Sequence, residues 1–180
     1  MEIDRDLLVI TIVGGVLTFG TYYYAYQSGK GNTLWAGVKP KHRHIYGISG
    51  ILAGLVFLYL FYYYIFYLNK KTKNFKTIVD VSIGLITFAS ATWVPLTFLG
   101  LKNRKYRFLS IIALLLVAIG SLMLVISTAL ANYNETDKEK HIKHDTRWVL
   151  ALISGSIFAF HVTFLDLLSW GPLYLDHIRY

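Results

Sequence analysis

The sequence predicts an all-α membrane protein, a bundle of five transmembrane helices that forms one domain over residues 1–180. Hydrophobic residues make up 55 % of the chain, and the mean hydropathy is +0.48, which is typical of membrane proteins. Apolar windows of about 20 residues recur at roughly 7–26, 45–68, 77–99, 106–131 and 148–170. These spans leave no room for a soluble domain, so we expect an integral, multi-pass membrane protein.

The charge distribution favours a lipid bilayer as partner and argues against nucleic acid. The net charge is +8, but the basic residues lie in short loops beside apolar spans, where anionic headgroups attract Lys and Arg. The 18 Lys and Arg residues divide evenly between the two faces of a five-span topology, so their count leaves the orientation open. The chain has no cysteine, which excludes thiolate metal sites and cysteine nucleophiles.

Helix-packing signals appear in the first two spans. Gly14 and Thr18 have the spacing of small residues that allow close helix approach, and Gly50 and Gly54 form a second such pair. The tyrosines that close the first span are typical of an interfacial aromatic belt. In the loop that follows, two histidines flank an arginine without an acidic neighbour, which is a poor pattern for a metal site.

The third and fourth spans differ in polarity. The third carries a mildly polar helical face that includes Trp93, and Pro95 predicts a kink just after Trp93 because proline lacks an amide hydrogen. Such a face indicates either a ligand cavity or a polar helix-packing seam. The fourth span is the most uniformly apolar, so we expect it to be the most lipid-exposed. The face of the third span comprises Ser82, Ile86, Ser90, Trp93 and Thr97.

The fifth span, 148–170, carries a stripe of small residues at helical spacing that Asp166 and Trp170 continue. A charged carboxylate facing lipid is costly, so Asp166 is expected to point into the bundle. Pro172 is expected to end the helix. The stripe comprises Ala151, Gly155, Ala159 and Thr163.

The titratable residues within the spans do not predict an enzyme. Acid–base catalysis needs at least two convergent titratable groups, and only Asp80, His161 and Asp166 lie within spans. On an α-helix His161 and Asp166 are separated by about 140°, so they are not expected to face one pocket. A haem held by two axial histidines is also disfavoured, because His161 has no second histidine within the spans. We therefore predict no catalytic residue, no metal site and no bound cofactor.

Three segments together resemble the translocator protein, or tryptophan-rich sensory protein, family of five-helix membrane proteins. The first, residues 35–40, is similar to a first-loop signature of Trp, small residues and Lys-Pro. The second, residues 93–98, is similar to a third-helix Trp-Pro-Pro motif, although Val94 replaces one proline. The third, residues 163–170, is similar to a fifth-helix Leu-Asn-x-x-x-Trp motif, with Asp166 in place of Asn.

The resemblance implies a protein that binds or transports a flat hydrophobic ligand, either a porphyrin such as haem or a sterol. The family fold implies a site between the helices and under the first loop, with Trp35 and Pro40 in its lid. Its other ligand-binding residues would be Ser90, Trp93, Pro95, Phe158, Val162, Asp166 and Trp170. The C-terminal segment also fits a loose sterol-binding pattern, formed by Leu168, Tyr174 and Arg179.

Two other functions stay open on the sequence alone. Asp166, with His161 assisting, indicates an ion or proton pathway. A structural membrane component without a ligand is the other alternative. All three functions (ligand binding, an ion or proton pathway, and a structural role) are compatible with a homodimer.

Overall fold

The computed structural model describes residues 4–67, 73–133 and 146–176, and this part of the chain is helical with short connections. The helices that start the chain are α1 (Arg5–Gln27), α2 (Arg43–Phe66), α3 (Lys73–Lys102) and α4 (Arg104–Tyr133). The last span begins as α5 (Thr146–Phe160), continues as a π-helix (His161–Trp170) and ends as α6 (Gly171–Asp176). Two 3-10 turns, Gly31–Trp35 and Pro40–His42, lie between α1 and α2.

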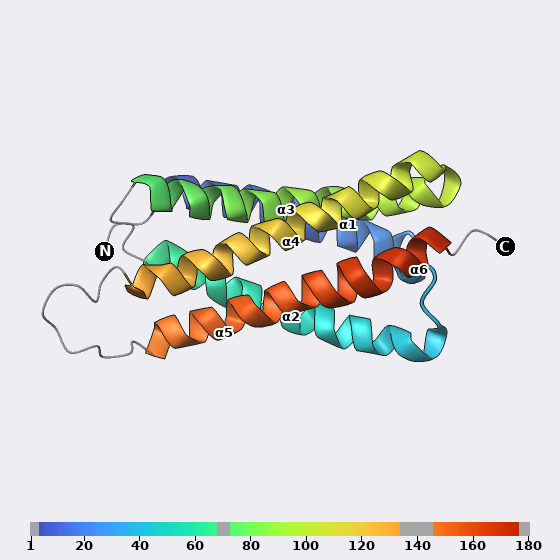
Figure 1. Cartoon of the computed structure of the whole chain (residues 1–180). Helices are drawn as coiled ribbons and strands as arrows, with labels where there is room; N and C mark the ends of the chain where they lie inside the picture. The colour runs from blue at the N-terminus through green and yellow to red at the C-terminus, as the bar shows by residue number, and fades with distance from the viewer. Residues whose placement is uncertain (1–3, 68–72, 134–145, 177–180) are drawn as a thin grey trace, which may run out of the picture.

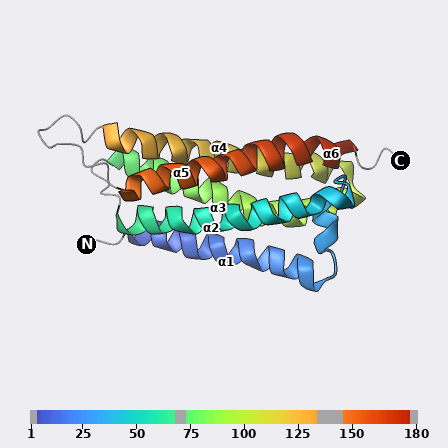
Figure 2. The same ribbon diagram turned by 90° about the horizontal axis from the view of Figure 1, so that it is seen from below.

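Five helical spans are each long and apolar enough to cross a membrane, as the sequence predicts. The all-α, five-helix fold class is therefore confirmed. The helices lie side by side along one axis, and the start of α1 and the end of α6 lie at opposite ends of the bundle (Figures 1 and 2). α1 packs on α3, α3 on α4, α4 on α5, and α5 on α2, while α2 touches α1 through few residues.

The prediction that the fourth span is the most lipid-exposed was wrong. In its most apolar window 44 % of the residues of α4 are buried, against 11 % for α1. α4 lies between α3 and α5 and also contacts the π-helix, so three neighbours cover it. Its uniform apolarity combines a face buried against other helices with an exposed apolar face that includes Leu115 and Ile126, and hydropathy alone cannot distinguish the two.

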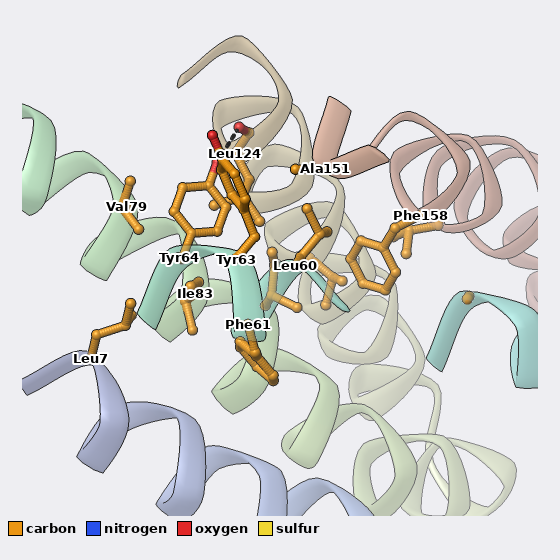
Figure 3. Packing of buried hydrophobic residues seen from close by; sticks show 14 of the residues in the cluster. Leu7, Leu60, Phe61, Tyr63, Tyr64, Val79, Ile83, Leu124, Ala151 and Phe158 are labelled. Atoms are coloured by element: carbon orange, nitrogen blue, oxygen red, sulfur yellow. Dashed lines mark hydrogen bonds between the residues drawn. The ribbon is translucent and has the colours of Figure 1, made fainter. Parts of the chain in front are cut away.

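The larger core lies towards the end of the bundle where α1 begins, and all five spans supply side chains to it (Figure 3). Tyr64 is its largest buried polar side chain: its hydroxyl donates to the Leu124 carbonyl at 3.0 Å and is hydrogen-bonded to Thr128. The bonded hydroxyl allows a tyrosine to be buried without leaving an unpaired donor. The labelled residues around it are Leu7, Leu60, Phe61, Tyr63, Val79, Ile83, Leu124, Ala151 and Phe158.

α1 packs closely on α3 at the small residues expected from the sequence. A Cβ built on Gly14 would lie 2.3 Å from Oγ1 of Thr87, so no larger residue fits there. The Thr18 hydroxyl donates to the Thr87 carbonyl at 2.9 Å, which adds a hydrogen bond at the same crossing. The small-residue spacing therefore predicted this contact correctly.

The second pair of small residues, Gly50 and Gly54 of α2, faces no other helix in the described part of the chain. A Cβ built on Gly50 or Gly54 would meet nothing within 4 Å. α2 turns a different face inward, which includes Ala53 and Leu60. The expected role of Gly50 and Gly54 in packing is therefore not met within this bundle.

α3 continues through Pro95 as a single α-helix, and the side chain of Pro95 is exposed. Its polar face packs against α4: the Thr97 and Ser110 hydroxyls are hydrogen-bonded at 2.8 Å. A Cβ built on Gly120 of α4 would lie 2.9 Å from the Ser82 carbonyl, so the two backbones approach closely. Of the two interpretations of this face, the contacts favour a helix-packing seam.

The small-residue stripe of the fifth span is buried, as expected. Ala151, Gly155 and Ala159 all lie inside, and a Cβ on Gly155 would approach a Val125 methyl at 3.2 Å and Leu60 at 3.8 Å. α5 therefore contacts α4 and α2 through this stripe.

Gly155→Leu is expected to lower the free energy of unfolding by about 1–3 kcal/mol, because the added side chain overpacks the contact with α4. Gly54→Leu is the matched control, since the same side chain meets open space there. Denaturation of the two detergent-solubilised variants would compare them. Equal destabilisation would show that the packed face of α5 is a different one.

The last span does not end at Trp170, and the prediction that Pro172 ends it was wrong. The helical span runs over 31 residues from Thr146 to Asp176, with Pro172 second in α6. Proline is tolerated in the first turn of an α-helix, where its missing N–H has no intrahelical acceptor. Pro172 directly follows the last π-helical bond, from the Gly171 N–H to the Asp166 carbonyl, so it lies where the hydrogen-bond pattern changes from π-helix to α-helix.

Candidate functional site

The π-helix changes which residues of the last span face each other. Its hydrogen bonds join residues five apart, as the bond from the Gly171 N–H to the Asp166 carbonyl shows. Residues five apart consequently lie above one another, and Nε2 of His161 lies 3.3 Å from Oδ2 of Asp166. The expectation that these two side chains point apart assumed α-helical periodicity and was wrong.

His161 is held from its other side by α2. The Ser49 hydroxyl is hydrogen-bonded to Nδ1 of His161 at 2.7 Å, and Nε2 lies beside Asp166, so Ser49, His161 and Asp166 form a continuous chain of polar contacts. A carboxylate beside Nε2 favours the tautomer with its proton on Nε2, so that the Ser49 hydroxyl donates to Nδ1. The His161 and Asp166 side chains are only 9 % and 20 % exposed, which places this chain inside the bundle.

Aromatic side chains gather between this chain and the first loop, and we call them the aromatic cluster. Trp93 and Trp170 meet edge to face with ring centroids 5.3 Å apart, and Tyr174 stacks on Trp170 at 4.5 Å. Tyr22 contacts Trp93, and Trp35 contacts Tyr46. The cluster, drawn from α1, the first loop, α2, α3 and the last span, comprises Tyr22, Trp35, Tyr46, Trp93, Trp170 and Tyr174.

The cluster holds two buried hydrogen-bond donors that lack acceptors. Nε1 of Trp93 and Nε1 of Trp170 have no hydrogen-bond partner in the part of the chain that the structure describes. Trp148, outside the cluster, shows the usual arrangement, because its Nε1 donates to the Thr128 carbonyl at 2.8 Å. Buried polar groups are paired in most proteins, and these two exceptions lie on rings that contact each other.

The cluster is otherwise well fixed by polar contacts. The Tyr174 hydroxyl donates to the Thr97 carbonyl at 2.7 Å, and the Tyr46 and Ser169 hydroxyls are hydrogen-bonded at 2.8 Å. These bonds join the last span to α3 and to α2. The unpaired indoles therefore lie in a rigid setting, which suits a binding site better than a loosely packed core.

The first loop covers this end of the bundle. Leu34, Ala36 and Val38 are buried, and Trp35 is half-buried against Tyr46. Gly37 has φ +85°, and a Cβ there would lie 2.3 Å from the Leu173 carbonyl oxygen, so the loop backbone presses on α6. Pro40 is exposed at the start of the second 3-10 turn.

The residues expected at the site are divided between two regions. Trp93 and Trp170 belong to the aromatic cluster, and Asp166 belongs to the neighbouring Ser49–His161–Asp166 chain. Phe158 and Val162 lie in the larger core, where Phe158 stacks on Phe57 at 4.6 Å. Ser90 is half-buried on α3, and Pro95 faces outward.

The sterol pattern is not presented on one surface. Leu168 is exposed, whereas the Tyr174 ring is completely buried and bonded to α3. Arg179 lies outside the described residues. No group of three or more His, Asp or Glu side chains able to hold a metal ion occurs in the described ranges.

An outer groove of about 370 Å³ between α3 and α4 includes none of the expected site residues. It is apolar, and two of its lining residues, Phe88 and Thr92, are exposed on the outside of α3. The lining residues are Gly84, Leu85, Phe88, Ala89, Thr92 and Leu116.

Sequence reasoning missed four participants: Tyr22, Tyr46, Ser49 and Ser169. Tyr22 was assigned to an interfacial belt, and the π-helix that brings Ser169 to Tyr46 has no recognisable sequence signal. Ser49 could have been found from its polarity, since it is the one hydroxyl residue in an otherwise apolar part of α2.

No protein-family model, curated protein or solved structure matches this chain. The resemblance to the translocator protein family therefore rests on the three segments named above. The contacts of the aromatic cluster and of the Ser49–His161–Asp166 chain are independent of that resemblance.

Proposed function

We propose that this is a multi-pass membrane protein that binds a planar amphipathic ligand at the aromatic cluster, under the first loop. The observation that carries the proposal is the pair of buried, unpaired indole N–H groups of Trp93 and Trp170. Each would donate to an acceptor on the ligand, while the surrounding rings contact its flat faces.

Two neighbouring donors favour a ligand with a carboxylate over one with a single hydroxyl. A carboxylate presents two oxygens and accepts strong, charge-assisted hydrogen bonds, whereas a sterol hydroxyl presents one oxygen. A porphyrin with carboxylate side chains therefore fits the cluster better than cholesterol. The ligand would enter where α1 and α2 meet, because these helices share few contacts and separate at the least cost.

The porphyrin need not contain iron. Nδ1 of His161 is hydrogen-bonded to Ser49 and Nε2 lies 3.3 Å from the Asp166 carboxylate, so each ring nitrogen already has a polar neighbour in the place of an iron atom. We expect protoporphyrin and haem to bind with similar affinity. A change of the haem spectrum in His161→Leu relative to the unsubstituted protein would contradict this expectation.

Trp93→Phe and Trp170→Phe test the proposal, because each removes an N–H but keeps an aromatic ring. Loss of one hydrogen bond to a charged acceptor costs about 1.5–3 kcal/mol, so porphyrin should bind at least about tenfold more weakly. Trp148→Phe is the control, since its N–H already has a partner in Thr128. Binding would be followed through the porphyrin absorbance in detergent, with cholesterol as the competing ligand.

Without ligand, the order of the variants should be reversed: Trp148→Phe should lose more folding stability than Trp93→Phe or Trp170→Phe. Trp148→Phe loses a hydrogen bond of about 1 kcal/mol, whereas Trp93→Phe and Trp170→Phe each lose an unpaired donor. Unchanged porphyrin affinity in both cluster variants would refute the proposed function. A tight cholesterol complex without porphyrin binding would replace the ligand class with sterols.

A second function, a proton pathway, is favoured by the Ser49–His161–Asp166 chain. Its members are in polar contact one after another within the bundle, and intramembrane acid–base pairs commonly move protons. Proton flux in liposomes that Asp166→Asn abolishes, combined with no porphyrin binding, would establish this function in place of the first.

A further inference from the structure

The net positive charge of the chain gathers at one end of the bundle. The fold brings the first loop, the turn between α3 and α4, and α6 together at the end away from the start of α1 (Figure 1). These segments carry eight cationic side chains, and Asp176 is the one acidic residue among their described residues. The cations, which we call the basic end, are Lys30, Lys39, Lys41, Arg43, Lys102, Arg104, Lys105 and Arg107.

The cations of the basic end are free to bind an external partner. None of the eight forms an ion pair within the described ranges, and all except Arg43 and Arg107 are exposed. Those two donate Nε to backbone carbonyls, Arg43 to Val38 at 3.2 Å and Arg107 to Gly100 at 2.7 Å. Both guanidinium groups are thus positioned at this end with their terminal nitrogens unused.

The opposite end compensates most of its own charge, although Arg5 there is exposed and forms no ion pair with the described residues. Lys76 there lies 2.8 Å from Asp80, 3.1 Å from Asp6 and 3.3 Å from Asp4. Arg147 packs over the Tyr67 ring. The adjoining stretches of sequence, 1–3, 68–75 and 134–145, nearly balance, with Lys70, Lys71, Lys73, Lys138, Lys140 and Lys143 against Glu2, Glu135, Asp137, Glu139 and Asp145.

Aromatic residues mark the basic end as a headgroup-level surface. Tyr23, Tyr24 and Tyr26 are 68 %, 62 % and 61 % exposed at the last turns of α1, beside the first loop. Exposed tyrosines occupy membrane interfaces because one part of the ring is apolar and the hydroxyl is hydrated. Cations at the same depth meet lipid phosphates, so the partner chemistry is an anionic phospholipid.

We propose that the basic end binds the headgroups of anionic phospholipids and therefore lies in the more anionic, cytosolic leaflet. The whole-chain count of Lys and Arg cannot show this, because it is tied between the two faces. The structure separates the cations that carboxylates neutralise, such as Lys76, from those that form no ion pair with the described residues. The proposal does not depend on the ligand of the aromatic cluster.

The first experiment tests lipid binding with two variants, each of which carries three substitutions in or beside a turn between helices. Lys102→Gln, Arg104→Gln and Lys105→Gln together remove cations of the basic end, and Lys70→Gln, Lys71→Gln and Lys73→Gln remove as many from the opposite end. Each cation near an anionic surface contributes about fivefold in affinity at low salt. Native mass spectrometry of phosphatidylglycerol against phosphatidylcholine should show at least tenfold weaker phosphatidylglycerol retention only in the first variant.

The second experiment tests the orientation in the membrane. The chain has no cysteine, so an introduced cysteine is the single site for thiol labelling. Ser28→Cys and Thr146→Cys place single thiols at opposite ends of the bundle. In intact cells an impermeant maleimide should label Thr146→Cys and leave Ser28→Cys unlabelled until lysis. Equal phosphatidylglycerol retention by the two triple variants, competition by inorganic phosphate alone, or labelling of Ser28→Cys in intact cells would overturn the proposal.

Discussion

Gly37→Ala is expected to lower the free energy of unfolding by about 2–4 kcal/mol, a large effect for one methyl group. Its φ of +85° lies in the left-handed region, which costs a residue with a Cβ roughly 1–2 kcal/mol. The new methyl would also lie 2.3 Å from the Leu173 carbonyl oxygen, and backbone cannot rotate away as a side chain can. The first loop would have to lift from α6.

Gly29→Ala provides the matched control. Gly29 has a similar φ of +69°, but a Cβ there meets nothing within 4 Å. This variant should therefore show only the conformational cost, about 1 kcal/mol. Chemical denaturation in detergent would measure both, and equal losses would show that the loop is not pressed against α6.

The same pair of variants connects stability with function. Lifting the first loop moves Trp35 from Tyr46 and exposes the aromatic cluster to water. Gly37→Ala should then weaken porphyrin binding as well as lower stability, whereas Gly29→Ala should bind normally. A normal affinity in Gly37→Ala would separate the loop from the ligand site.

The helices themselves could be predicted because membrane spans are set by length and apolarity, which a sequence shows directly. The close contacts at Gly14 and Gly155 were predictable for the same kind of reason, since only small residues let backbones approach. The equal spacing of Gly50 and Gly54 proved uninformative within the bundle. Small residues permit contact, but the neighbouring helices decide which permitted contacts form.

The chemistry of the candidate site was harder to predict because it depends on helix geometry. An α-helix separates His161 from Asp166, and the π-helix brings them within 3.3 Å. The two unpaired indoles likewise come from α3 and the last span, so no local pattern relates them. Trp93 and Trp170 could be named as candidates, but their shared lack of acceptors is a property of the fold.

His161→Leu is expected to lower the free energy of unfolding by about 3 kcal/mol, because it leaves the Asp166 carboxyl inside the bundle without its neighbouring donor. Asp166→Asn should cost less than about 1 kcal/mol, since the amide keeps a polar oxygen beside Nε2 of His161. Ser49→Ala removes one hydrogen bond and should cost about 1 kcal/mol. The order of the three losses in unfolding free energy thus shows which polar contact contributes most to stability.

A double-mutant cycle isolates the contact between the two side chains. His161→Leu combined with Asp166→Leu replaces a buried polar pair with apolar side chains, which is often nearly neutral, so the double variant should be more stable than His161→Leu alone. The coupling free energy should reach about 1–3 kcal/mol. Additive losses would mean that His161 and Asp166 do not interact, and the π-helical register that brings them together would then be incorrect.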